Sequence, residues 1–354
     1  MIKISKEKLT ALLLKIVESY GVNKEKGKYL VENLVRSDLR GIRSHGINNF
    51  TYYLSLIESG TIDPNGEPKI INETAATALI DGNKGFGQYI CKFATMKAIE
   101  KAKNNVIGTV AVRNSGHMGH ISDYTRMILD ENMIGIMYVN CDKAVAPFGG
   151  RTTVLGTNPL SYALPAGKEK PIVIDFATSA TAGSKLAHFL RKGEKIPEGW
   201  AVDSNGEIVT DPKKLFINPV VPLKWGDNYT GSLLPAAGHK GYGLALFIDI
   251  MTGALTGGRV NGEVIDGENY AFIQAINPDG FIQRELYNER VDKLIRACKS
   301  SKLQIGIKEI LMPGEPESRY EKECLELGIP IEEELWDEII KVGAKYNIDI
   351  KLIQ

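Results

Sequence analysis

The chain contains 354 residues, of which 43% are hydrophobic and 24% are charged, as in ordinary folded proteins. This length suits two or three lobes or one large elaborated domain. Lysine and arginine together number 43, and so do aspartate and glutamate, so the net charge offers no attraction to nucleic acid or to an anionic membrane. We therefore expect neither as a partner.

The sequence also lacks the features of a secreted or membrane-anchored protein. No uninterrupted apolar run approaches the ~20 residues that span a bilayer. The N-terminus has no apolar stretch followed by a small-residue cleavage site. The cysteines are far apart and form no CxxC pair, and they are Cys91, Cys141, Cys298 and Cys324. We expect a cytoplasmic protein with no disulfide framework and no zinc site.

The first part of the chain is predicted to be helical. Leucine, isoleucine and valine recur at helical spacing over 5–20, with Ser5 as a cap and Gly21 as a stop. A second helix follows Asn23, and a third covers 47–59. Arg43, Ser44 and His45 therefore fall in the short link between the second and third helices, where polar groups are available for chemistry.

From about residue 75 apolar strands alternate with helices, which predicts an α/β body around a largely buried sheet. The expected strands are 77–80, 106–112, 134–139, 172–174 and 270–276. The expected helices are 88–103, 121–130, 284–298, 332–346 and a strongly apolar, buried helix over 241–255. Residues 211–234 read as a long surface loop. We expect a helical part (1–75) packed with a helical C-terminal part (300–354), and an α/β body (76–299) that holds cofactor and substrate.

A Rossmann dinucleotide fold is not indicated, because no GxGxxG follows a strand and opens a helix. A phosphate-binding turn must be built differently. The turn before the 241–255 helix is a candidate, since a helix N-terminus offers free N–H groups and Lys240 stands beside it. The simpler alternative for Lys240 is a solvated surface lysine.

Two histidines on glycine-rich turns are candidates for acid–base chemistry. His45 lies in Ser44-His45-Gly46, and imidazole suits proton transfer near neutral pH. Its structural alternative is to cap the third helix. His117 follows a predicted strand, where a histidine can also be purely structural. His117 and His120 form an HxxH pair, but no third ligand follows at metal-like spacing, so we expect no metal.

Seven motifs, in order along nearly the whole chain, resemble those of the type-2 malate/L-lactate dehydrogenase family, which includes ureidoglycolate and sulfolactate dehydrogenases and diketogulonate reductase. They are the DxxGxxSHG turn, NSxHxG, PFGG, GTNP, DxATS, KGYGL and PGE segments, which occupy 38–46, 114–119, 147–150, 156–159, 175–179, 240–244 and 313–315. The resemblance implies a non-Rossmann mixed-sheet fold, NAD or NADP as cofactor, reversible reduction of 2-oxo acids or related imines, and a homodimer.

The resemblance also implies site residues. His45 or His117 is the proton donor, and the two can share the site, one giving the proton and one holding the substrate oxygen. Ser44, Asn49 and Arg43 are expected to contact the substrate. The implied cofactor-binding residues are Cys141, Asp175, Phe176, Ala177, His239, Lys240, Gly314 and Glu315. Besides Lys240, two of these have structural alternatives, since Asp175 can cap a helix and Cys141 can be a small buried filler.

The chain departs from the family at Asn49. Relatives usually carry an arginine three residues after the SHG glycine, where a guanidinium can hold a substrate carboxylate. Asn49 offers hydrogen bonds but no charge, unless Arg43 or Arg151 substitutes. We therefore expect a 2-hydroxy/2-oxo acid dehydrogenase, with a cyclic imine or diketo-acid reductase, or a non-catalytic metabolite-binding relative, as alternatives.

Overall fold

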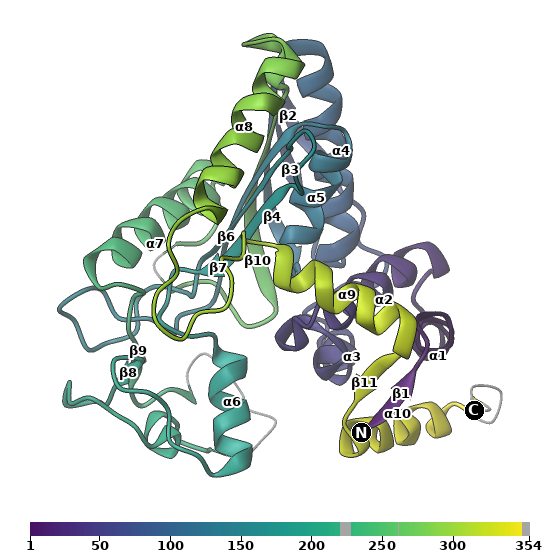
Figure 1. Ribbon diagram of the computed structural model, residues 1–354. Coiled ribbons are helices and arrows are strands. Elements are labelled where there is room, and N and C mark those ends of the chain that lie inside the picture. The colour runs from purple at the N-terminus through teal and green to yellow at the C-terminus, as the bar shows by residue number, and fades with distance from the viewer. Residues whose placement is uncertain (220–227, 261, 349–354) are drawn as a thin grey trace.

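The computed structural model describes residues 1–219, 228–260 and 262–348 and is built around one seven-stranded mixed sheet (Figure 1). The strand order is β2-β3-β4-β10-β5-β6-β7. The strands are β2 (Lys69–Glu73), β3 (Thr77–Asp81), β4 (Ile107–Gly116), β10 (Glu268–Ile276), β5 (Ile134–Asn140), β6 (Pro159–Leu164) and β7 (Ile172–Ala177). Only β3 and β4 pair in parallel, and the other neighbours are antiparallel. This order differs from a doubly wound parallel sheet, in agreement with the missing glycine fingerprint.

Helices cover both faces of the sheet. Figure 1 shows α4 (Gly87–Asn105) and α5 (Ser122–Asp130) on one side and α7 (His239–Thr252) on the other. Val110, Met137 and Ile273 point toward α4 and α5 in one buried cluster. Gly108 permits the close approach of α4, because a Cβ there would lie 2.0 Å from the Ala98 carbonyl oxygen.

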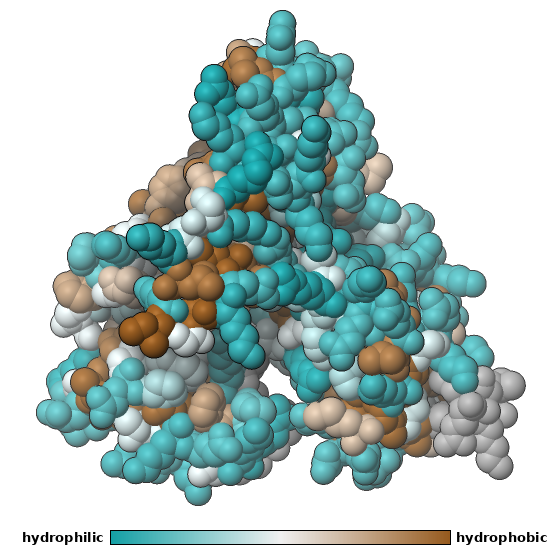
Figure 2. Space-filling model, in the orientation of Figure 1, coloured by the Kyte–Doolittle hydropathy of each residue, from teal (hydrophilic) through white to brown (hydrophobic). Residues whose placement is uncertain are grey.

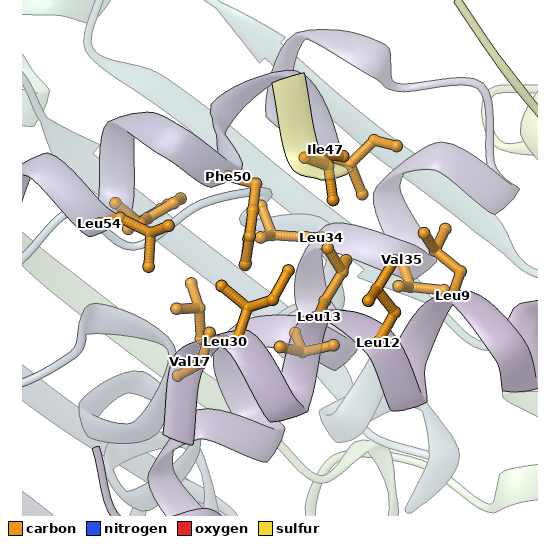
Figure 3. Packing of buried hydrophobic residues seen from close by; sticks show 14 of the residues in the cluster. Leu9, Leu12, Leu13, Val17, Leu30, Leu34, Val35, Ile47, Phe50 and Leu54 are labelled. Carbon is orange, nitrogen blue, oxygen red and sulfur yellow. The ribbon is translucent and has the colours of Figure 1, made fainter. Parts of the chain in front are cut away.

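The two ends of the chain share a second core. α1 (Lys6–Ser19), α2 (Lys24–Leu39) and α3 (Phe50–Glu58) bury the predicted leucine and valine faces against one another (Figure 3). Ser5 and Asn23 cap the first two helices. β1 (Ile2–Ile4) pairs with β11 (Ile329–Ile331), which brings α9 (Glu315–Leu327) and α10 (Glu333–Lys345) to this core. The boundaries 1–75, 76–299 and 300–354 stay a prediction.

Most predicted elements are confirmed, including the four early strands, β10, α4, α5, α8 (Arg284–Lys299) and α10. Sequence reasoning missed β1, β2, β6, β11, α9, the helix α6 (Gly183–Lys192) and the two-residue strand β8 (Ala201–Val202). None of the helices among the described residues is long and apolar enough to cross a membrane.

Two expectations are wrong. Residues 211–234 are not simply a surface loop, because they contain a 3-10 turn (Pro212–Leu215) and β9 (Ser232–Leu233), and Leu215, Phe216 and Leu233 are buried. The middle of that segment, 220–227, lies outside the described residues. The apolar helix at 241 is present as α7, but only one of its faces is buried. Its outer face leaves Leu244, Leu246, Phe247 and Ile250 between 38% and 57% exposed.

Candidate active site

The SHG turn is shaped by a buried carboxylate at the end of α2. Two 3-10 turns, Arg43–His45 and Ile47–Asn49, follow α2 and lead into α3. The Asp38 carboxylate accepts the Ile47 N–H at 2.7 Å. A Cβ at residue 46 would lie 2.1 Å from an Asp38 oxygen, so only glycine fits there. Burial raises the pKa of Asp38 to about 7. Asp38 is thus a positioning group for the turn that carries His45.

Within this turn the side chains contact one another. The Ser44 hydroxyl lies 2.9 Å from His45 Nδ1. The Asn49 amide donates to the Ser44 carbonyl at 2.8 Å, so it supports the turn. Arg43 donates to the Tyr320 hydroxyl of α9 at 3.3 Å, and Arg151 donates to the Asn205 carbonyl at 3.1 Å. Arg43 and Arg151, the two candidates to replace the missing arginine, therefore both contact other segments of the chain.

His117 comes from the end of β4 and meets His45 face to face. Its backbone N–H donates to the Gly267 carbonyl at 2.7 Å, which fixes the loop beside β10. The two imidazole rings are nearly parallel, with centroids 6.0 Å apart and planes 12° apart. Tyr52 meets His117 edge-on, and the Tyr53 hydroxyl lies 2.6 Å from His117 Nδ1. Two histidines 72 positions apart in the sequence thus form one pair.

Both imidazoles of this pair are neutral at pH 7. Burial lowers the pKa of His45 to about 4. Burial and the neighbouring His45 lower the pKa of His117 to about 3. Both side chains nevertheless keep some exposed surface. In the described part of the chain neither Nε2 atom has a hydrogen-bond partner, so each remains available to a small molecule.

His120 and Asp175 lie next to this pair. The Asp175 carboxylate accepts the Ser122 N–H at 2.8 Å and lies 3.5 Å from His120 Nε2, which also contacts the Ser122 hydroxyl. Burial raises the pKa of Asp175 to about 7. Burial, with a further contribution from His45, holds the pKa of His120 well below its usual value. His120 thus has structural partners that the HxxH spacing did not reveal.

Cys141 is connected to the His117 loop through Asn269. The Asn269 side chain accepts the Met118 N–H at 2.9 Å and lies 4.0 Å from the Cys141 sulfur. Burial raises the pKa of the Cys141 thiol to about 12, so the group is a neutral thiol. Cys141 therefore lines this region as a small uncharged group.

The remaining residues that were predicted to bind cofactor lie on the edge strand β7 or near its ends. Phe176 on this strand is 45% exposed, beside Asp175 and Ala177. The turn into α7 docks on the end of β7, where a Cβ at Gly241 would lie 2.6 Å from the Thr178 carbonyl oxygen. Lys240 is exposed at the first turn of α7 and forms no ion pair with any other described residue. The His239 ring meets Phe148, with centroids 6.0 Å apart.

At its other end β7 meets the PGE turn. The Val173 N–H donates to the Pro313 carbonyl at 3.0 Å, and Gly314 has a φ of 92° at the start of α9. The Glu315 carboxylate is buried, accepts the Met312 N–H and contacts Lys299. This carboxylate is committed to the turn itself. Asp175 thus lies on β7, with Lys240 and Gly314 near its two ends, although no hydrogen bond or ion pair among the described residues joins Lys240 to the histidine pair.

Sequence reasoning missed three residues that support the histidine pair. Tyr53 and Gln88 form a hydrogen-bonded chain to His117, and Asn269 holds its loop. Tyr53 stands on the helix directly after the SHG turn. Gln88 directly follows Gly85-Phe86-Gly87, a segment considered only as a fragment of a Rossmann motif. A buried polar residue on an otherwise apolar helical face is the signal that would have pointed to both.

Comparison with known proteins extends over nearly the whole chain. The profile of the malate/L-lactate dehydrogenase family matches residues 4–340. The chain is 38% identical to malate dehydrogenase from Pyrococcus abyssi, covering 98% of this chain and 96% of that protein. It is 30% identical to ureidoglycolate dehydrogenase (NAD(+)) from Escherichia coli K12, covering 98% and 97%. A solved structure of sulfolactate dehydrogenase from Methanocaldococcus jannaschii superposes with a TM-score of 0.89 at 35% identity, covering 99% of each chain.

Proposed function

The chain belongs to the malate/L-lactate dehydrogenase family, and from that premise we propose that His45 and His117 together act on the reacting oxygen of its substrate. As a member of this family it is an oxidoreductase of the CH–OH group that interconverts 2-hydroxy and 2-oxo acids. The observation that carries the assignment is the parallel pair of neutral imidazoles, 6.0 Å apart, whose Nε2 atoms have no hydrogen-bond partner among the residues that the structure describes.

The reaction requires both proton transfer and hydrogen-bond stabilisation at the substrate oxygen. A nicotinamide, when bound, exchanges a hydride with the substrate carbon. The substrate oxygen must then lose a proton during oxidation or gain one during reduction, and a hydrogen-bond donor must stabilise it while its charge changes. Two neutral imidazoles can supply both the proton transfer and the hydrogen bond. Ser44 and Asn49 hold the turn that carries one of them, and Asn269 holds the loop that carries the other.

The residues along β7 fit a dinucleotide. Lys240 is an exposed cation at the start of the 14-residue helix α7, where N–H groups and the positive end of the helix dipole favour phosphate. Phe176 offers an exposed ring, and Asp175 and Ala177 lie beside it. We propose that these residues, with Cys141, His239 and the Gly314–Glu315 turn, bind NAD or NADP.

The position of Asn49 bears on the substrate. Its amide is occupied by the Ser44 carbonyl, and it carries no charge for a carboxylate. This observation favours, as a second candidate, a cyclic imine or diketo-acid reductase whose substrate does not need a guanidinium at this point. A non-catalytic relative that binds a metabolite in the same place is the alternative that a turnover measurement decides.

We also propose that the chain works as a homodimer. The outer face of α7 exposes large apolar side chains, and Leu255 beyond its end is 58% exposed. A second apolar surface lies on the segment between α8 and α9, where Leu303, Ile305 and Ile307 are at least 47% exposed; Figure 2 shows brown residues gathered there. Such surfaces mark interaction sites. A cytoplasmic location stays a prediction.

The test is direct. NADH and NADPH fluorescence is titrated with protein, and turnover is then measured over a panel of 2-oxo acids, diketo acids and cyclic imines. We expect saturable binding of at least one cofactor and oxidation of it by at least one substrate. Two flat titrations at high protein concentration would contradict the proposal, and binding without turnover would favour the non-catalytic relative.

A further inference from the structure

The two histidines have different hydrogen-bond partners at Nδ1, and this difference separates their roles. We propose that Tyr53, oriented by Gln88, is a positioning residue that holds His117 as the tautomer with its proton on Nε2. His117 then donates a hydrogen bond to the substrate oxygen, and His45 alone transfers the proton. The inference rests on the proposed function, since it divides the work of the same pair.

The tautomer of His117 follows from counting donors at Nδ1. The Gly119 backbone N–H points at this atom at 3.3 Å, and a backbone N–H can only donate. Nδ1 therefore carries a lone pair and no proton. The Tyr53 hydroxyl, 2.6 Å from the same atom, must then donate to it as well. In the neutral ring the proton is consequently on Nε2, the atom that has no partner in the described part of the chain.

Gln88 completes the arrangement. Because the Tyr53 hydroxyl gives its proton to His117, its oxygen must accept, and the Gln88 amide nitrogen lies 2.7 Å from it. The opposite orientation of this amide would make the Tyr53 hydroxyl donate to Gln88 and would require a proton on His117 Nδ1, against the Gly119 N–H. Tyr53 is fully buried and Gln88 is 2% exposed, so water does not compete for these positions.

The contact at His45 is of another kind. Its Nδ1 meets the Ser44 hydroxyl, which can donate or accept by rotating about one bond. The ring can therefore hold one proton on either nitrogen or two protons. During oxidation the substrate hydroxyl would give its proton to the unprotonated nitrogen of His45, and a bound nicotinamide would supply the hydride acceptor that the proposed function requires. His45 then carries both protons until its partly exposed ring returns one to water, and reduction reverses both transfers.

Neutral His117 cannot exchange a proton in this way. Its Nε2 already bears a proton and has no lone pair for a substrate hydroxyl. Giving that proton up would leave an imidazolate anion beside His45 in a buried corner, which is strongly unfavourable. Donating a hydrogen bond to the oxygen is therefore the role that remains, as for other preorganised donors aimed at developing negative charge.

The first test observes the tautomer without cofactor or turnover. The full chain is labelled with ¹⁵N-histidine, and long-range proton–nitrogen correlations are recorded, which is practical because the chain has only five histidines. The His117 signals are assigned from their loss in His117→Gln. We expect a protonated Nε2 and an unprotonated Nδ1. A proton on Nδ1 would overturn the inference.

Two tyrosine variants test the positioning role. Tyr53→Phe keeps the ring and removes the donor, and we expect a detectable fraction of the Nδ1-protonated tautomer. Tyr52→Phe is the matched control, because Tyr52 also packs against His117 but its hydroxyl donates to Asp266 at 2.5 Å. We expect the tautomer to be unchanged there. An unchanged tautomer in Tyr53→Phe, or an equal change in both variants, would overturn the assignment of Tyr53.

A kinetic comparison tests the division of roles. Glutamine offers an N–H donor near the position of imidazole Nε2 but cannot transfer protons. We expect His117→Gln to recover about tenfold of the kcat lost in His117→Ala, and His45→Gln to be no better than His45→Ala. The reverse pattern, or no recovery in His117→Gln, would overturn the division. If the wild-type protein neither binds NADH or NADPH nor turns over, the proposed function fails, while the tautomer result still stands.

Discussion

The region around His45 and His117 and the outer surface of α7 differ in how far contacts within the chain satisfy their side chains. Around His45 and His117 both Nδ1 atoms and the turns that carry the rings have partners within the chain, from Asp38 below the SHG turn to Gln88 behind Tyr53. On α7, Lys240 is exposed without an ion pair among the described residues, and Phe247 and Ile250 are 47% and 57% exposed. In the first region, which we call the complete region, the chain itself positions both rings. The second region leaves charge and apolar area on its surface.

The difference teaches which parts of the function one chain provides alone. Groups that act on the reacting atoms need fixed geometry before the substrate arrives, and buried partners supply it. Groups that bind a cofactor phosphate or a second subunit gain their partners only on association. A lone lysine at a helix start and an apolar helix face are therefore expected where other molecules complete the structure.

The largest effect is expected in the complete region. His45→Ala removes the proton-transferring group and should lower kcat by about two to four orders of magnitude, and His117→Ala should lower it by about two to three. NADH affinity should change little, because neither ring is among the proposed phosphate contacts. Steady-state kinetics and fluorescence titration measure the two quantities. His188→Ala, on the exposed face of α6, is the control. Near-normal rates in both variants would refute the assignment.

The next effect is expected on α7. Phe247→Glu places a charge in the middle of its apolar outer face and should raise the dimer dissociation constant by at least about thirtyfold, the loss typical of an interface hot spot. Analytical ultracentrifugation of both proteins measures this. Met96→Glu is the matched control, since Met96 is also exposed (54%) but lies on α4. A wild-type monomer, or equal dissociation in the two variants, would contradict the homodimer.

The same two regions show which features could be predicted from the sequence and which could not. The apolar spacing of Leu9, Leu13 and Val17 predicted α1 correctly, because helix periodicity is local. The SHG turn was also placed correctly between α2 and α3. The partnership of His45 with His117 was an expectation of the family motifs, and no local pattern joins them. The contacts of Tyr53 with His117 and Gln88, 64 and 35 positions apart, depend on how α3 and α4 pack.

The error on α7 has a physical origin. An apolar helix has the same composition whether its outer face is covered by its own chain or by another one. Periodicity therefore cannot distinguish a core helix from an interface helix. Likewise, the role of Asn49 as a support for Ser44 could not be read from the residue type, because asparagine serves equally well as a ligand and as a turn residue.

A moderate effect is expected at Asn49, in the turn that carries His45. Asn49→Arg gives up one hydrogen bond to Ser44 and adds a guanidinium that can hold a carboxylate. We expect kcat/KM for simple 2-oxo acids to rise by about tenfold, the value of one good charged contact. Asn49→Gln is the control, because it lengthens the side chain and adds no charge. No gain with arginine would mean that the carboxylate is held elsewhere.

The smallest effect concerns the buried acid that shapes the complete region. The pKa of Asp38 is raised to about 7 in the folded chain, against about 4 for an unfolded aspartate. The folded state thus binds this proton more tightly, and the resulting stability is fully present below pH about 4 and is lost as the pH rises through about 7. Asp38→Asn keeps an oxygen for the Ile47 N–H and removes the titration.

Between pH 5 and pH 8 the free energy of unfolding of this variant should therefore gain about 1 kcal/mol or more relative to wild type. The lowered pKa values of His45 and His117 act in the opposite direction between about pH 3 and 6.5, but they are common to both proteins and cancel in the difference. Urea denaturation at the two pH values measures it, with Asp130→Asn at the exposed end of α5 as control. Parallel pH curves would mean that Asp38 ionises as easily as a surface carboxyl, so that its burial does not hold a proton in the turn that carries His45.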